Sequence, residues 1–95
     1  MQYQLRDYRI KPGEIDEWMA AWSTRIRPLR EEFGFRVMGA WLVAEQDRFI
    51  WILGREDFAA ADERYYESAA RASIQPDPAR HLASSEHAFI EPVDR

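Results

Sequence analysis

The chain has 95 residues, of which 46% are hydrophobic and 14% aromatic, and its formal net charge is −4. A chain of this length supports one domain over residues 1–95, and its apolar content is too high for a disordered segment. Cysteine is absent, which excludes disulfides, thiolate catalysis and cysteine-ligated metal sites. The arginines are spread along the sequence, which argues against a surface for nucleic acid or for an anionic membrane.

The first residues show neither the basic segment nor the apolar segment of a secretory signal. Later apolar runs are also shorter than the ~18 residues of a membrane helix. We therefore expect a cytoplasmic protein that makes no membrane contact.

Residues 2–10 carry apolar side chains on both faces of a period-2 pattern, which predicts a strand that packs on two sides. A Lys-Pro-Gly turn at residues 11–13 ends this strand. From residue 15 to residue 33 apolar side chains recur at the spacing of one helical face. Pro28 interrupts the pattern, so we expect a kink or a short second segment there, and Gly34 suits the end of the helix.

Residues 35–44 and 49–54 are rich in β-branched and aromatic side chains and predict a hairpin that is apolar at odd and even positions alike. A second helix is expected from residue 56 to about residue 73, with its apolar face continuing through Ala69 and Ala72. A loop or single turn then follows around two prolines, and a last strand is expected near residues 84–93.

This order of elements predicts an α+β chain with the ferredoxin-like β-α-β-β-α-β arrangement, in which two helices cover one face of a four-stranded antiparallel sheet. The other face would then expose a larger apolar patch than monomers usually show. We expect a second copy to cover this face, which would give a homodimer built as an α/β barrel. The alternative is that tilted edge strands or the C-terminal loop hide the face within one chain.

Several runs of residues, in this order and spacing, resemble the NIPSNAP family. They are Leu5 to Gly13, the helix from Trp18 to Trp22, Phe35 to Trp41, Asp47 to Trp51, and Tyr65 to Ser68. The resemblance covers nearly the whole chain and is strongest through Phe58. It departs after Ser68, where Ala-Ala-Arg-Ala-Ser replaces the Pro-Glu-Trp-like segment common in the family.

The NIPSNAP family belongs to the dimeric α/β-barrel superfamily, in which two ferredoxin-like chains face their sheets together around a cavity. The resemblance therefore implies a fold and a mode of pairing. Members of the superfamily include haem-degrading monooxygenases, cofactor-free oxygenases, cyclases and proteins without an assigned reaction. The resemblance accordingly implies no particular reaction and transfers no catalytic residues.

Three polar side chains of the first strand, Gln4, Arg6 and Tyr8, share one face. If Tyr3 and Leu5 pack under the helices, these three side chains point into the cavity between the two sheets. There Arg6 can hold a carboxylate or phosphate, and Tyr8 can orient or protonate a ligand oxygen.

The other titratable residues favour structural roles. Arg6 itself has the alternative of pairing with a carboxylate such as Glu86 and so linking the two chains of the dimer. His81 and His87 match no metal-binding spacing. One histidine would suffice for a haem iron, but we expect His81 to be a lone surface residue and His87 to be structural or to titrate without a functional role. Trp18 and Trp22 are expected to pack beneath the sheet.

The acidic pairs at residues 31/32, 56/57 and 62/63 are expected to be solvated, because adjacent side chains diverge on a helix. The sequence therefore predicts a NIPSNAP-like protein without a metal or cofactor and without identifiable catalytic residues. Its predicted role is to bind a small apolar or aromatic ligand with one polar handle, in a cavity between the sheets of a homodimer. Two alternatives stay open: a haem-dependent or cofactor-free monooxygenase, and a non-catalytic dimeric interaction module.

Overall fold

The computed structural model describes residues 1–94 of the chain. Its strands are β1 (Gln2–Ile10), β2 (Arg36–Val43), β3 (Arg48–Arg55) and β4 (Leu82–Ile90). Its α-helices are α1 (Ile15–Ala21), α2 (Arg27–Glu32), α3 (Phe58–Glu67) and α4 (Ala69–Ala72). Three further helical turns are η1 (Trp22–Ile26), η2 (Ala44–Gln46) and η3 (Pro78–His81).

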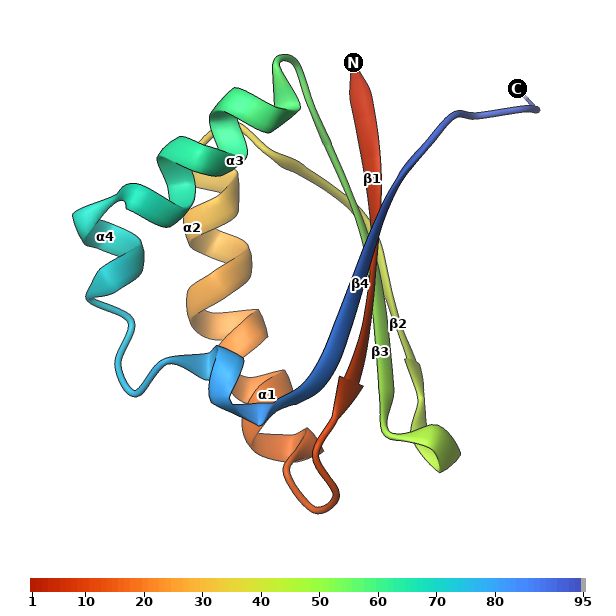
Figure 1. Ribbon diagram of the computed structural model, residues 1–95, viewed down its shortest axis with the longest axis vertical. Coiled ribbons are helices and arrows are strands. Elements are labelled where there is room, and N and C mark those ends of the chain that lie inside the picture. Colours follow the sequence, from red (N-terminus) through yellow and green to blue (C-terminus); the bar gives the residue numbers. More distant parts are fainter. Residues whose placement is uncertain (95) are drawn as a thin grey trace.

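The strands form one antiparallel sheet in the order β2-β3-β1-β4, so β1 and β3 are central. Figure 1 shows the four α-helices on one side of this sheet. The ferredoxin-like α+β arrangement expected from the sequence is therefore confirmed. The helices bury one face of the sheet, and we call the other the open face.

The first helical segment packs on the sheet through an apolar stripe. Trp18, Trp22 and Ile26 recur every four residues, so they lie on one side of the segment, and all three are buried. Trp22 lies edge-on to Phe49 and Trp51 of β3, with ring centroids 5.1 and 5.5 Å apart. The expectation that Trp18 and Trp22 pack beneath the sheet is confirmed.

Pro28 divides this segment, as the sequence predicted. Proline has no amide N–H to donate, and its ring crowds the carbonyl four residues earlier, which here belongs to Thr24. The chain forms the π-helical turn η1 directly before α2, and Pro28 lies in the first turn of α2. This short second helix places Arg30 in the interior and ends before Gly34, whose φ of 84° favours glycine.

The hairpin contains a bulge that the sequence did not reveal. Val37 pairs with Leu53 while Gly39 pairs with Ile52, so the residue between them has no partner of its own in the register. A bulge shifts the two-residue alternation by one position. This shift explains why apolar residues occur at both odd and even positions of β2.

The side chains of β1 face the opposite way from the expectation. Gln4, Arg6 and Tyr8 are buried on the helix-covered face, whereas Tyr3 and Leu5 lie on the open face. The expected packing of Tyr3 and Leu5 under the helices is therefore wrong. The alternation indicated which residues share a face but not which face the helices cover, because both faces carry apolar residues.

The open face is apolar along its centre. It carries Tyr3, Leu5, Ile50 and Ile52 from the two central strands. On β2, Met38 is 46% exposed and Trp41 is 53% exposed. Large apolar side chains thus remain accessible on this face within the described residues.

The second helical segment is interrupted where the sequence predicted a continuous helix. α3 ends at Glu67, Ser68 adopts an extended backbone, and its Oγ accepts a hydrogen bond from the amide of Arg71 at 3.0 Å to cap α4. Ala69 and Ala72 are consequently exposed, so the expected apolar face through them is wrong. The break turns α4 toward the cavity described below.

The longest α-helix of residues 1–94 is α3, with 10 residues. None of the helices in this part of the chain has the length and apolar character needed to cross a membrane.

Candidate functional site

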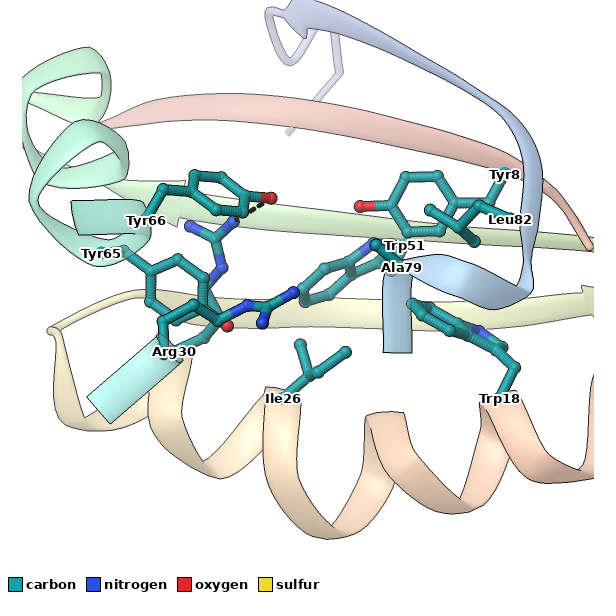
Figure 2. A pocket seen from close by; sticks show the side chains of 10 residues that line it. Tyr8, Trp18, Ile26, Arg30, Trp51, Tyr65, Tyr66, Ala79 and Leu82 are labelled. Carbon is teal, nitrogen blue, oxygen red and sulfur yellow. Dashed lines mark hydrogen bonds between the residues drawn. The ribbon is translucent and has the colours of Figure 1, made fainter. Parts of the chain in front are cut away.

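A cavity of about 60 Å³ lies between the sheet and the helices. Figure 2 shows the side chains that line it, which are Tyr8, Trp18, Ile26, Arg30, Trp51, Tyr65, Tyr66, Arg71, Ala79 and Leu82. Arg30, Tyr65 and Tyr66 form a polar end, whereas Trp18 and Leu82 belong to an apolar end. The cavity therefore combines an apolar wall with a cluster of hydrogen-bond donors.

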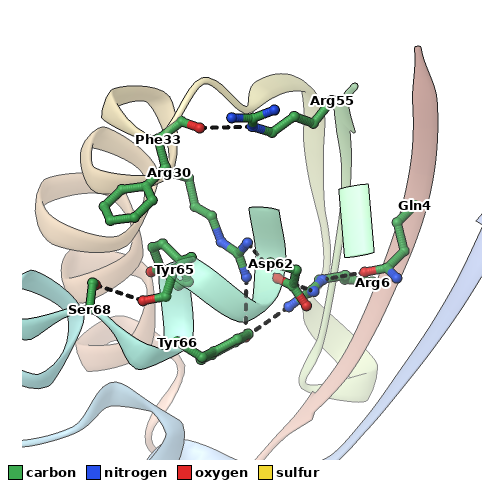
Figure 3. A network of polar contacts seen from close by, with 9 residues as sticks. All are labelled: Gln4, Arg6, Arg30, Phe33, Arg55, Asp62, Tyr65, Tyr66 and Ser68. Carbon is green, nitrogen blue, oxygen red and sulfur yellow. Dashed lines mark hydrogen bonds and ion pairs between the residues drawn. The ribbon is translucent and has the colours of Figure 1, made fainter. Parts of the chain in front are cut away.

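Four side chains at the polar end form a closed ring of hydrogen bonds (Figure 3). Arg6 Nη2 donates to Asp62 Oδ1 at 3.0 Å, and Arg6 Nη1 donates to the Tyr66 hydroxyl at 2.9 Å. Arg30 binds the same two acceptors, with Nη1 donating to Asp62 Oδ1 at 2.7 Å and Nη2 donating to Tyr66 at 3.2 Å. We call Arg6, Arg30, Asp62 and Tyr66 the arginine ring.

The arginine ring carries more positive than negative charge. Arg6 and Arg30 are 0% and 1% exposed, and both face the single carboxylate of Asp62. Burial opposes the charge on Arg6, but the oxygens of Tyr8, Tyr66 and Asp62 outweigh burial and raise the pKa of Arg6. Arg6 therefore stays cationic, and the ring favours a further negative charge nearby.

The structure places the three sequence-predicted site residues at different distances from the cavity. Tyr8 lines it directly. Arg6 contacts the lining through its hydrogen bond to Tyr66, and Gln4 lies behind Arg6 and accepts a hydrogen bond from Arg6 Nε at 2.8 Å. The expected location in a cavity between two sheets is wrong for these residues, because they face the helices of their own chain.

Tyr8 lies beside Arg6 on the same face of β1 and across the cavity from Tyr66. Its hydroxyl and that of Tyr66 point toward one another in Figure 2. Burial raises the pKa of Tyr8, and the charge of Arg6 offsets this effect in part. Tyr8 is therefore a neutral phenol at physiological pH and can donate a hydrogen bond. An edge-on contact with Trp18, at 5.5 Å between ring centroids, holds its ring.

Several buried donors around the cavity lack an acceptor. Within residues 1–94, no protein hydrogen bond reaches Trp18 Nε1, Arg30 Nε or Tyr65 Oη. Arg30 stacks on the ring of Tyr65, with Cζ 3.8 Å from the centroid. Burial raises the pKa of Tyr65, so its hydroxyl also keeps its proton. The lining is thus rich in donors, and an oxygen-bearing ligand supplies the acceptors that such donors need.

One side of the cavity is covered by α4 and the loop that follows it. Arg71 Nη2 donates to Asp77 Oδ1 at 2.9 Å, and the same oxygen accepts from the amide of Ala79 at 2.9 Å. Arg71 and Ala79 both line the cavity. This cover lies in the segment where the sequence was expected to depart from the family pattern.

Two expectations about carboxylates are wrong. Asp62, expected to be solvated, is the shared partner of two buried arginines. Glu86, named as an alternative partner for Arg6, instead lies opposite Asp7 in the register between β1 and β4. Arg6 does pair with a protein carboxylate, but this is Asp62 of the same chain, so the expected pairing that links two copies is not what the structure shows. Arg30 and Tyr66 were also not recognised as site residues.

The two histidines occupy different environments. His81 is 4% exposed, and its Nδ1 lies 2.8 Å from Glu14 Oε1, so the expectation of a lone surface histidine is wrong. His87 is exposed on β4 opposite Arg6, with its ring centroid 6.3 Å from that of Tyr8. Although its side chain is accessible to solvent, neighbouring atoms remove part of the hydration of the His87 ring, and this partial desolvation and then the charge of Arg6 lower its pKa. Within residues 1–94 the structure brings no three metal-ligating side chains together.

Comparison with known proteins settles the family. The NIPSNAP family model matches residues 3–94. This chain belongs to the NIPSNAP family. No curated protein matches the sequence of this NIPSNAP protein.

Solved structures show the same fold at low sequence identity. An uncharacterized NIPSNAP domain protein from Burkholderia xenovorans is 21% identical, with a TM-score of 0.84 over 97% of this chain and 94% of that chain. A NIPSNAP family protein from Agrobacterium tumefaciens is 17% identical, with a TM-score of 0.85 over 98% and 93%. A putative antibiotic biosynthesis monooxygenase from Nitrosomonas europaea is 15% identical, with a TM-score of 0.71 over 99% and 100%. At these identities the likeness concerns the fold alone.

Proposed function

We propose that this NIPSNAP protein binds a small organic anion in the cavity between its sheet and its helices. The observation that carries the proposal is the arginine ring, in which two buried guanidinium groups share one carboxylate beside the cavity. A buried cation without a full counter-charge is costly, so an anion that enters the cavity gains electrostatic stabilisation. As in the sequence analysis, an arginine of the first strand contributes to binding the polar group of the ligand. The proposed site, however, lies inside one chain and not between the sheets of two chains.

The polar and the apolar end of the cavity have different roles in the proposed binding. Arg30 and Tyr66 lie at the polar end and are placed to hold the charged oxygens, with Tyr8 donating from the opposite wall. Arg6 acts through Tyr66, and Gln4 orients Arg6. The apolar part of the ligand then packs on the aromatic wall that includes Trp18.

The volume of the cavity limits the size of the ligand. An apolar cavity of about 150 Å³ is known to admit benzene, which is more than twice the space available here. Propionate has five non-hydrogen atoms against six in benzene, so it enters if the lining moves by a small amount. An aromatic acid or phenol enters only after a larger movement of the cover formed by α4, which carries Arg71, and the loop that follows it.

Titration with matched probes tests the proposal. Trp18 and Trp51 line the cavity, so their fluorescence should respond saturably to propionate and much less to propionamide, which has nearly the same shape without the charge. Arg30→Met should abolish the response, whereas Arg64→Met, on the exposed side of α3, should leave it unchanged. Equal responses to acid and amide, or a full response in Arg30→Met, would rule the proposal out.

A cofactor-free monooxygenase is the second candidate, supported by the fold shared with proteins described as antibiotic biosynthesis monooxygenases. A haem does not fit a cavity of about 60 Å³, and Nδ1 of His81 is already engaged by Glu14. Consumption of dissolved oxygen by the purified protein with small phenols would support this candidate, and its absence across such a series would count against it.

We also propose that the protein forms a homodimer through the open face and acts in the cytoplasm. The dimer is supported by the exposure of Met38 and Trp41 among other apolar side chains, and by the pairing of sheets that the resemblance to the dimeric α/β-barrel superfamily implies. The open face of a second copy carries the same apolar side chains, so the two open faces can bury one another. A purely interacting dimer without a ligand is the outcome if no probe binds.

A further inference from the structure

The Tyr66 hydroxyl has an unusual hydrogen-bonding state. Its oxygen accepts from Arg6 Nη1 at 2.9 Å and from Arg30 Nη2 at 3.2 Å. Both donors are cationic, and both guanidinium groups are held by Asp62, which fixes their directions. A phenol oxygen that accepts two hydrogen bonds has its own O–H left as its remaining polar group.

The hydroxyl proton must therefore point away from both arginines. Tyr66 lines the cavity, and its hydroxyl end is directed across it toward Tyr8 (Figure 2). Within residues 1–94, no protein acceptor takes a hydrogen bond from this hydroxyl. The two guanidinium groups also draw electron density from the oxygen, which makes the O–H a stronger donor than that of an ordinary tyrosine.

We propose that Tyr66 is the specificity-determining residue of the site and donates its phenolic hydrogen to an oxyanion bound in the cavity. This inference rests on the proposed function and narrows its ligand to compounds whose bound oxygen accepts hydrogen bonds without donating them. Carboxylates and enolates have such oxygens, whereas a neutral alcohol of the same size does not carry the charge that the arginine ring favours.

A purely structural role for Tyr66 predicts the opposite result for its removal. In that case the hydroxyl merely occupies two arginine N–H groups that would otherwise bind an anion themselves. Removing the oxygen would then release one donor from each of Arg6 and Arg30, and an anion in the cavity would bind more tightly. The two roles therefore differ in the sign of the effect on affinity.

Tyr66→Phe decides between these roles because it removes the hydroxyl oxygen and leaves the ring. We expect propionate to bind Tyr66→Phe about tenfold or more weakly than wild type, as for the loss of a hydrogen bond to a charged group. Tyr3→Phe, on the open face, serves as the matched control and should bind like wild type. Tyr66→Leu, which also lacks the oxygen, should show the same loss and provides a second variant if Tyr66→Phe does not fold.

Each outcome of this experiment is decisive. Unchanged or tighter binding of propionate by Tyr66→Phe or Tyr66→Leu would overturn the assignment of Tyr66 and leave the anion site in place. If neither wild type nor any of the variants binds propionate, both proposals are overturned. Thermal melting of each variant without ligand establishes that the compared proteins are folded.

Discussion

Asp62 and Tyr66 lie one helical turn apart on α3, and each accepts a hydrogen bond from both Arg6 and Arg30. The two acceptors differ in charge, since Asp62 supplies a full negative charge and Tyr66 a neutral hydroxyl. The two arginines therefore compete for one carboxylate. Loss of the Asp62 carboxylate should consequently lower the free energy of unfolding more than loss of either arginine.

This difference gives a prediction for two variants of the ring. Asp62→Asn leaves two buried cations side by side without a counter-charge and should lower the free energy of unfolding by about 3–5 kcal/mol. Arg6→Met leaves Asp62 still paired with Arg30, so the expected loss is smaller, about 1–3 kcal/mol. Urea denaturation of both variants measures the two losses, and a larger loss in Arg6→Met would contradict this account of the ring.

The sequence was sufficient for the order of strands and helical segments, because hydrophobic periodicity and turn residues are local signals, but it missed the break between α3 and α4 and the bulge in β2. It was not sufficient for the partner of Arg6. Asp62 lies 56 positions away in the chain, and on a helical wheel it borders the buried face marked by Ala61 and Tyr65 without belonging to the apolar pattern. The four-residue spacing of Asp62 and Tyr66 places both on one side of α3. This spacing could indicate a partner for Arg6 only once Arg6 was known to point toward the helices.

Hydrophobic periodicity also could not predict which face of β1 the helices cover, for a related reason. Tyr3 and Leu5 on one side are matched by Tyr8 and Ile10 on the other, and the expectation placed Tyr3 and Leu5 inside. In the structure an arginine lies inside because Asp62 and Tyr66 of α3, together with Gln4 of β1, accept its hydrogen bonds. Such long-range compensation involves the whole fold, so one strand cannot reveal it.

A second prediction concerns the dependence of stability on pH. Partial desolvation, followed by the charge of Arg6, lowers the pKa of His87 below its ordinary value of 6.5. Arg30 acts in the same direction, and Asp62 opposes them. The unfolded chain therefore binds a proton at His87 more readily than the folded chain, so stability should fall as the pH decreases below 6.5.

His87→Gln removes this titration, so the stability of this variant should decrease less steeply than that of wild type as the pH falls below 6.5. Chemical denaturation of wild type and His87→Gln, at several pH values on the acid side of 6.5, provides the comparison. The stability difference between the two proteins should change with pH in that window and stay constant above it. Parallel curves throughout would show that His87 titrates alike in the folded and unfolded states.

The third prediction tests the proposed dimer. Light scattering at micromolar concentration should return about twice the chain mass of 11.3 kDa. Trp41→Glu places a charge in the apolar strip of the open face and should shift the protein toward the monomer. Arg64→Glu, on the helix side, should leave the dimer intact. A wild-type monomer at this concentration would contradict the proposed pairing of sheets.

The last prediction concerns the cover of the cavity, where Arg71 and Asp77 form an ion pair at 2.9 Å. Asp77 is 52% exposed, so Arg71→Ala leaves no buried charge unpaired, but the Arg71 side chain is itself 11% exposed and its packing is lost, so we expect an ordinary destabilisation of roughly 0.5–3 kcal/mol. The same change removes a long side chain from the cavity wall and frees α4 from the loop before η3. The variant should then bind benzoate relatively better than wild type does, while propionate affinity changes little. Competition of the two acids, followed by tryptophan fluorescence, measures this ratio. A ratio equal to that of wild type would show that Arg71 does not limit the size of the ligand, and that the walls formed by Trp18 and Ile26 set the limit instead.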